Sequence, residues 1–290
     1  MGFHVTPLRS GSSGNLTLVE HAGTILLVDA GLPSQRGLVA ALTEADCSWD
    51  DVDALLVSHL HGDHVNGSAV ACCARFEIPI HLHRKNLDGF SKKVLSRAPG
   101  NCPVRPFSDG ETFSIGGIGI EPFRVPHDAR GVTCGFTFTS ASRDVRVSMA
   151  TDLGQNENGL FERFLDSDLI LIEANYDEEM LNRSPRLDRG RVGSNVGHFS
   201  NAQAGKFLVR VLQESRKEAL LADLVLVIGT SAVVYPAAEV PMIAQQRGAT
   251  LIEVNPNPSA ISELCHLSIR LPAGEALPAI VALLPRLERG

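Results

Sequence analysis

Long apolar runs are absent from this 290-residue sequence. No stretch approaches the ~18 consecutive apolar residues expected of a membrane-spanning helix. The first residues, Met1–His4, lack the basic region and apolar core of a signal peptide. The composition, 44% hydrophobic and 20% charged, is typical of a soluble globular protein. We therefore expect a cytoplasmic protein with no membrane partner, built as one large domain or two small ones.

Paired cysteine motifs and an excess of positive charge are also lacking. None of the six cysteines forms a Cys-x-x-Cys pair, which argues against a zinc ribbon and is compatible with reduced, cytoplasmic thiols. The formal net charge is −7. This charge excludes a strongly basic nucleic-acid-binding surface over the whole chain, although a local basic patch stays open.

Three histidines and one aspartate lie within six residues, directly after the apolar residues 54–57, and they are His59, His61, Asp63 and His64. The apolar residues predict a short buried strand, and the polar residues predict a loop at its end. His59 and His61 can reach one ion, while Asp63 and His64 can reach a second. Two ions about 3.5–4 Å apart can bind the attacking and the leaving oxygen when a phosphoester bond is displaced. The sequence therefore predicts a metal centre in this loop.

Other strand ends carry further candidate ligands. His127 follows a predicted strand over 120–125 and suits the first ion, while Asp152 follows a strand over 145–150 and could bridge the two ions. Asp29 ends a strand over 24–29, where it either orients a ligand or simply makes a turn. His81 and His83 share one face of a strand, but we expect them to be structural because the cluster already fills a site.

The remaining pattern predicts elements that alternate between strands and helices. Helices are expected over 37–45, 67–76, 161–165 and 201–214, and a buried strand over 168–173. Residues 181–197 are predicted to form a loop. This loop carries a local basic cluster, read either as phosphate contacts or as a solvated surface, that consists of Arg183, Arg186, Arg189 and Arg191.

Several motifs in order resemble one protein family. They are Ser10–Asn15, Val28–Gly31, the histidine cluster, His127–Ala129, Thr151–Gly154, Glu173–Asp177 and Gly197–Asn201. Together they resemble the YycJ/WalJ-like branch of the metallo-β-lactamase superfamily over about residues 3–212. The resemblance implies an αββα sandwich and an exonuclease-type activity on DNA.

The resemblance also implies roles for individual residues. His59, His61 and His127 would hold one ion, Asp63 and His64 the other, and Asp152 would bridge them. Asp63 would also orient the attacking hydroxide of a two-metal mechanism. His198 matches the histidine thought to help the leaving oxygen depart, so Asp63 and His198 are the expected catalytic residues.

The C-terminal part departs from this family, because the expected last ligand histidine is missing. Residues 218–285 instead resemble the C-terminal half of a sirtuin NAD-binding domain, on Leu224–Ser231, Val233–Ala238 and Leu251–Pro256. That resemblance implies a nucleotide-binding remnant at Gly229, Thr230, Ser231 and Asn255. The sirtuin phosphate loop, catalytic histidine and four-cysteine module are absent, so neither NAD binding nor deacylase activity is expected.

The C-terminal segment predicts a strand over 224–228, a helix over 237–247 and a strand over 250–254. We expect residues 1–215 to form the metallo-β-lactamase-like domain, and 216–290 to pack into the same sheet as its last strand-helix-strand unit. The rival is a small appended piece with an exposed sheet edge. Such a piece would hardly bury enough surface to fold alone.

The sequence thus favours a metal-dependent hydrolase, a phosphodiesterase or nuclease that uses two divalent ions, zinc or manganese. The second site would be weak because it lacks one imidazole. One alternative is a metal- or nucleotide-binding protein without effective turnover. Another is a hydrolase that cleaves a thioester at the same metal site.

Overall fold

The computed structural model describes residues 2–94, 102–142, 144–155, 159–214, 224–228, 239–246, 248–271 and 276. The chain divides into two compact units. The first contains residues 1–163, 169–171 and 195–197, and the second contains 164–168, 172–194 and 198–290. This division differs from the expected boundary at 215, because the second unit begins before the sirtuin-like segment.

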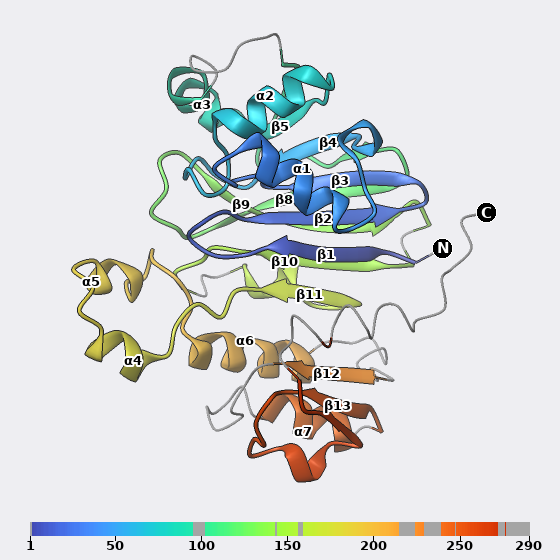
Figure 1. Cartoon of the computed structure of the whole chain (residues 1–290), viewed down its shortest axis with the longest axis vertical. Coiled ribbons are helices and arrows are strands. Elements are labelled where there is room, and N and C mark those ends of the chain that lie inside the picture. Colours follow the sequence, from blue (N-terminus) through green and yellow to red (C-terminus); the bar gives the residue numbers. More distant parts are fainter. Residues whose placement is uncertain are drawn as a thin grey trace. The chain divides into compact units, whose positions relative to one another are not determined.

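The described residues of the first unit form one mixed sheet, one sheet with antiparallel pairs and the helices α1 to α3 (Figure 1). One sheet has the order β1-β2-β3-β4-β5-β6 and consists of His4–Arg9, Leu16–His21, Thr24–Val28, Ala54–Val57, Ile80–His83 and Val104–Phe107. The other has the order β11-β10-β9-β8-β7, with β7 to β11 at Phe113–Ile115, Ile118–Val125, Thr133–Ser140, Arg146–Ala150 and Leu169–Ile172. The helices are α1 (Gln35–Thr43), α2 (Gly67–Arg75) and α3 (Leu87–Lys93).

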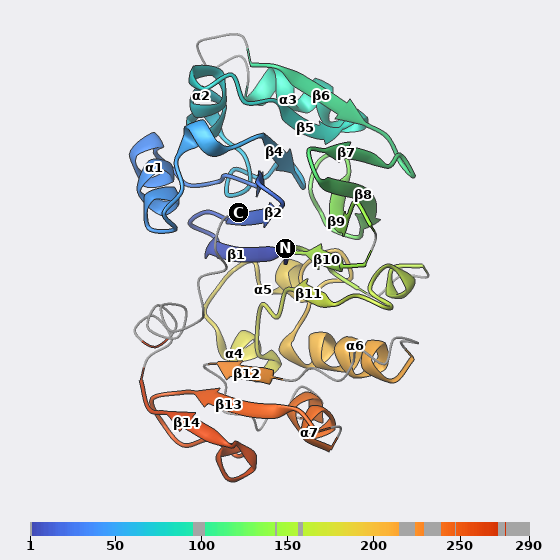
Figure 2. The ribbon, with the colours of Figure 1, turned by 90° about the vertical axis from the view of Figure 1, so that its right-hand side faces the viewer.

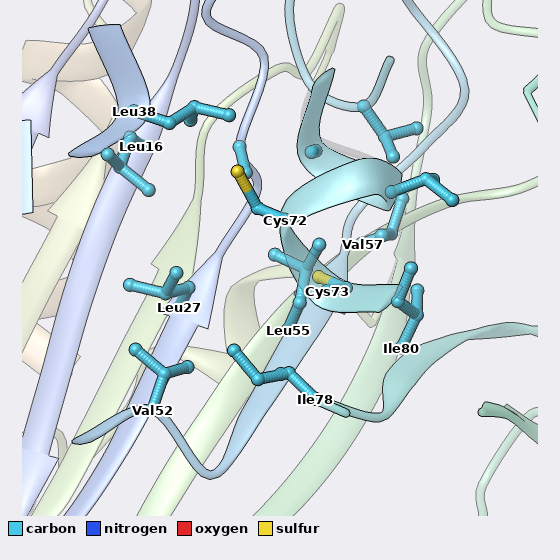
Figure 3. Packing of buried hydrophobic residues seen from close by; sticks show 14 of the residues in the cluster. Leu16, Leu27, Leu38, Val52, Leu55, Val57, Cys72, Cys73, Ile78 and Ile80 are labelled. Carbon is cyan, nitrogen blue, oxygen red and sulfur yellow. The ribbon is translucent and has the colours of Figure 1, made fainter. Parts of the chain in front are cut away.

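Strand pleating divides the buried side chains of the first sheet between two cores. Alternate residues of a strand point to opposite faces. Leu26 and Leu56 therefore pack with the phenylalanines of the second sheet, whereas Leu27 and Leu55 pack beneath the helices. Figure 3 shows the helix-side core, where Cys72 and Cys73 of α2 lie over these leucines. Both faces of the sheet are thus covered, which agrees with the continuous apolar runs of β3 and β4.

Parallel pairing places the metal-loop segment at the end of the first sheet where its parallel strands terminate. Strands β3, β4, β5 and β6 pair in parallel. Their C-terminal ends therefore lie at the same end of the sheet. Asp29 follows β3, the histidine cluster follows β4, and Arg84 follows β5. Polar side chains from separate segments therefore lie at the same end of this sheet.

The second unit contains helices and a small parallel sheet. Its helices are α4 (Glu178–Arg183), α5 (Arg189–Val192), α6 (Asn201–Glu214) and α7 (Glu239–Gln246). Its strands are β12 (Leu224–Ile228), β13 (Thr250–Val254) and β14 (Leu267–Ile269), which lie side by side in Figure 2. The predictions of a helix over 201–214 and of strands over 224–228 and 250–254 are confirmed.

Three expectations are wrong. Residues 181–197 are not only a loop, because α4 ends and α5 lies within them. Strand β11 is not buried, since Leu169 is 43% exposed. In the described part of the chain, β12 and β13 do not extend a sheet of the first unit; they pair with β14, which the sequence analysis missed. Pairing with β14 supplies the hydrogen bonds that a sheet of the sandwich was expected to supply.

Candidate metal centre

The loop that follows β4 is held by backbone contacts from two other segments. The amide of Asn15 donates to the Asp63 carbonyl at 2.7 Å, and the Ala30 amide donates to the His64 carbonyl at 2.8 Å. Gly31 allows this approach, since a Cβ atom built there would lie 1.8 Å from the Asp63 oxygen. The geometry of the histidine cluster therefore depends on a residue without a side chain.

Three imidazole nitrogens converge at the end of β4. The Nε2 atom of His59 lies 2.9 Å from Nδ1 of His61, which lies 3.3 Å from Nε2 of His127. One nitrogen from each ring lies within 4.8 Å of the others. The three nitrogens could together hold one cation.

The opposite nitrogens of two of these rings have hydrogen-bond acceptors. The Nδ1–H of His127 donates to the Gly197 carbonyl at 2.9 Å. The Ser58 hydroxyl donates its proton to Asp29 at 2.7 Å, so it accepts from Nδ1–H of His59 at 3.0 Å. These bonds place the ring protons on Nδ1 and leave Nε2 of His59 and His127 as lone-pair donors.

A second group joins His59, His64 and Asp152. Nε2 of His64 lies 2.8 Å from Oδ2 of Asp152, and its Nδ1 lies 2.7 Å from Oδ2 of Asp29. Asp63 lies farther away, with Oδ2 4.0 Å from Nε2 of His64 and with its side chain 33% exposed. This group offers a mixed nitrogen and oxygen donor set, and Asp63 faces solvent beside it.

Burial and neighbouring charges shift the pKa values of two histidines in opposite directions. Burial, together with the neighbouring His64, lowers the pKa of His59 well below its usual value. Burial also disfavours protonation of His64, but the Asp29 and Asp152 carboxylates outweigh it and raise its pKa to about 10. The two carboxylates thus favour the protonated form of His64, whereas burial favours the neutral form of His59.

Asp29 takes part in this network instead of only making a turn. Its backbone φ is +59°, an uncommon value for a residue with a side chain. Its Oδ1 accepts hydrogen bonds from the Ser58 amide at 2.8 Å and the Ser58 hydroxyl at 2.9 Å. The carboxylate thus fixes both Ser58 and His64.

The two strand histidines of β5 lie outside these groups. His81 stacks on Phe113, with ring centroids 5.2 Å apart. Nε2 of His83 lies 3.1 Å from Asp109, and its Nδ1 accepts the Lys85 amide. Both rings have structural partners in the first unit.

His198 belongs to the second unit, where Glu173 holds it. Oε2 of Glu173 lies 3.1 Å from Nδ1 of His198, and Oε1 accepts the Phe199 amide at 2.9 Å. The carboxylate thus fixes the orientation of the imidazole.

The arginines of the expected basic cluster also lie in the second unit, and several of them have partners. Arg183 pairs with Glu179 at 3.2 Å, and Arg186 pairs with Asp188 at 2.9 Å. Arg189 donates to two backbone carbonyls, and Arg191 lies in α5. Local partners therefore compensate part of the charge of this cluster, which was read either as phosphate contacts or as a solvated surface.

The proposed nucleotide-binding residues are only partly described. Gly229, Thr230 and Ser231 lie outside the described residues. Asn255 uses its amide to bond the Ile269 carbonyl and its side-chain oxygen to accept from Asn257. His266, which directly precedes β14, accepts the Leu251 amide through Nδ1 at 3.0 Å. Both described residues therefore have structural roles in the small sheet.

Three residues with a place in these networks escaped the sequence analysis. They are Ser58, Glu173 and Asn15, whose Nδ2 lies 3.0 Å from Nε2 of His64. Each occurs in a motif that was noted, but nothing in the order of residues indicates which imidazole it contacts. Among the described residues, no helix has the length and apolar character of a membrane span.

Comparisons with known proteins agree with this fold. Residues 24–219 match the family model described as a β-lactamase superfamily domain. The exodeoxyribonuclease YycJ of Bacillus anthracis is 31% identical over 229 residues, which cover 77% of this chain and 83% of that protein. The solved structure of Zn(2+)-bound PqqB from Methylobacterium extorquens has a TM-score of 0.57 and 16% identity, with 85% of this chain and 96% of that chain covered. The expected metallo-β-lactamase fold is confirmed.

A second similarity involves a shorter segment. An NAD-dependent protein deacylase of Mycobacterium leprae is 49% identical over 65 residues, which cover 22% of this chain and 27% of that protein. The sirtuin-like resemblance is thereby confirmed for a part of the chain only. The family model and the YycJ match each cover most of the chain, so this chain belongs to the YycJ/WalJ-like group of the metallo-β-lactamase superfamily.

Proposed function

We propose that this protein is a metal-dependent phosphodiesterase that hydrolyses nucleic acid. The observation that carries the proposal is the convergence of His59, His61 and His127 through three ring nitrogens. Structural histidines have no need to turn lone pairs toward one another, whereas a cation requires it.

The donor set fits a divalent transition metal. In a tetrahedral zinc site with Zn–N bonds of about 2.0–2.1 Å, two ligand nitrogens lie about 3.3–3.4 Å apart. The distances of 2.9 and 3.3 Å in the first group are close to this value. Imidazole and carboxylate ligands suit zinc and also accept manganese, the two ions that we propose.

The second ion would be held by His64, Asp63 and the shared Asp152. This set contains one imidazole fewer than expected for the family, so we propose weaker binding at this position. Thr230, which occupies about the place of the missing ligand in the sequence, carries a neutral hydroxyl and is a poor substitute.

Divalent ions at these positions would lower the pKa of a bound water and neutralise charge on the phosphoryl oxygens. Asp63, whose carboxylate is partly exposed beside the cluster, would accept a hydrogen bond from the attacking water and orient it. His198, held by Glu173, would donate a proton to the leaving oxygen. In this proposal Asp63 and His198 are the catalytic residues.

The substrate class comes from the relatives. YycJ is named an exodeoxyribonuclease, so we propose a DNA strand as substrate for this chain. The arginines at 183, 186, 189 and 191 stay candidates for phosphate contacts. We also propose a cytoplasmic location, in keeping with six free cysteines.

A second candidate function is metal or nucleotide binding without turnover. The observation that favours it is the absence of the last ligand histidine in a segment similar to a deacylase. Metal ligands alone would satisfy this function, whereas hydrolysis also gives the Glu173–His198 pair a role in proton transfer.

Metal content and hydrolysis test the proposal together. After loading with zinc or manganese and dialysis, elemental analysis should give close to two ions per chain, with the second released first by a chelator. The loaded protein should hydrolyse bis(p-nitrophenyl) phosphate and a labelled oligodeoxynucleotide. One ion per chain would overturn the two-metal mechanism, and metal without hydrolysis would favour the binding function.

A matched pair of variants separates the cluster from other histidines. His61→Ala should lose the first ion and all hydrolysis, because it removes the nitrogen shared between two contacts. His81→Ala, a histidine of the same unit that stacks on Phe113, should keep both. Equal metal loss in both variants would contradict the assignment of the site.

A further inference from the structure

The segment after β5 lies against two loops of the candidate metal centre. A 3-10 helix, Arg84–Asn86, leads into α3, and a Cβ atom at Gly89 would lie 2.9 Å from the side chain of Leu60, between the ligand candidates His59 and His61. Strands β4 and β5 pair in parallel as far as Val57 and Leu82, so the chain leaves both strands at the same end of the sheet. The segment therefore borders the metal loop.

The same segment also holds the loop that follows His127. The buried Asn86 donates to the Val132 carbonyl at 2.8 Å and accepts the Val132 amide at 2.8 Å. At Gly131, with a φ of +89°, a Cβ atom would lie 2.1 Å from the Asn86 side-chain oxygen. The same Cβ atom would lie 3.6 Å from the Lys85 carbonyl oxygen, so the segments that carry Arg130 and Lys85 run close together.

Lys85 and Arg130 are exposed cations without an acidic partner among the described residues. Other cations of the first unit have side-chain partners: Arg124 pairs with Asp109, and Arg84 donates to the Ser108 hydroxyl at 3.3 Å. Lys85 and Arg130 keep their full charge for an anionic ligand, and in an otherwise acidic chain they lie on segments that border the metal loop.

We propose that Lys85 and Arg130 bind the phosphates of a nucleic-acid strand next to the bond that is cleaved. The inference rests on the proposed function and deepens it. It adds phosphate contacts in the first unit to the candidates at residues 183–191, several of which have local partners. A lysine and an arginine that contact only the backbone give affinity without sequence preference.

The test measures binding of a fluorescent single-stranded oligothymidylate with phosphorothioate linkages to the metal-loaded protein at several salt concentrations. The double variant Lys85→Ala/Arg130→Ala should bind about tenfold more weakly, and its salt slope should be shallower by about 1.4, since each contact to a single strand contributes about 0.7. The matched control is Arg75→Ala, which removes an exposed cation at the far end of α2. The control should bind as the wild type does.

A kinetic ratio separates this inference from the proposed function. The ratio of kcat/KM for the oligonucleotide to kcat/KM for bis(p-nitrophenyl) phosphate should fall about tenfold in the double variant, and Lys85→Arg alone should preserve it. An unchanged salt slope, or an equal loss for both substrates, overturns the inference. If the salt slopes of wild type and double variant differ by about 1.4 but the wild type hydrolyses neither substrate, the inference is upheld and the proposed function is overturned.

Discussion

At the scale of the residue, Ser58 connects the parts of the candidate metal centre. Its hydroxyl donates to Asp29 and accepts from His59, while its amide donates to the same carboxylate. The side chain is 2% exposed, so no water can replace these bonds cheaply. Ser58 therefore fixes which nitrogen of His59 is free for a metal.

We predict that Ser58→Ala lowers zinc affinity by about 10- to 100-fold, the range known for partners that orient metal-binding histidines. Ser58→Thr keeps the hydroxyl and should retain most of the affinity. Competition with a chromophoric chelator would measure both. Equal affinity in the alanine variant and the wild type would show that the hydroxyl does not orient His59.

A second prediction compares Gly31, which packs against the metal loop, with Gly62, which lies within that loop. Gly31→Ala places a methyl group 1.8 Å from the Asp63 oxygen, so the loop must move and metal binding should fall at least about tenfold. Gly62→Ala meets nothing within 4 Å and is the matched control. Metal titration followed by calorimetry would compare them. Similar affinities for the two variants would contradict the close approach seen at Gly31.

At the scale of the element, α2 is fixed at its start by a single side chain. Asn66 caps the helix by accepting the amides of Ser68 and Ala69. Its Nδ2 group donates to the carbonyls of Gly31 and Gly62, and to a third carbonyl at Leu32. One asparagine thus joins the helix, the metal loop and the segment after β3.

We predict that Asn66→Ala destabilises the protein by about 3 kcal/mol, because it removes a cap and a partly buried amide whose Nδ2 group contacts three carbonyls. Ser34→Ala removes a cap with one hydrogen bond at the start of α1 and should cost about 1 kcal/mol. Urea unfolding would measure both. Equal costs would mean that the carbonyl contacts of Asn66 contribute nothing.

The spacing of apolar residues predicted many helices and strands well, and it missed short elements that bury few apolar side chains. Helix α6 and strands β12 and β13 have the predicted bounds, because their apolar spacing is regular. Helices α4 and α5 escaped because they are short and polar. In α4 no residue is buried, so there was no apolar stripe to find.

At the scale of the whole molecule, the sirtuin-like segment has a sheet of its own. Within it, Glu253 is 1% exposed and accepts hydrogen bonds from Ser259, Ser262, Ser268 and Arg270. A buried carboxylate with four donors stabilises the end of this sheet without any nucleotide.

We therefore predict that NAD at about 1 mM leaves the thermal midpoint of the full chain unchanged. A ligand that binds the folded protein and is present at 100 times its Kd would instead add about 2.7 kcal/mol of stability and raise the midpoint. Asn255 already bonds within the loop that follows β13, and no phosphate loop of the sirtuin type occurs in the sequence. Differential scanning fluorimetry with zinc as the positive control would measure this. A midpoint that rises with NAD concentration would overturn the prediction.

The sequence by itself determined the family, the strand and helix pattern, and the set of histidines and aspartates expected at the metal centre, because ligand chemistry and apolar periodicity are local properties. Only the tertiary structure decided that His127 faces His61, that Ser58 and Asp29 set the ring protons, and that the segments carrying Lys85 and Arg130 approach each other. It also decided that β12 and β13 pair with β14. These contacts join residues far apart in the chain, and strand pairing and close backbone approach select them from many arrangements that the same pattern allows.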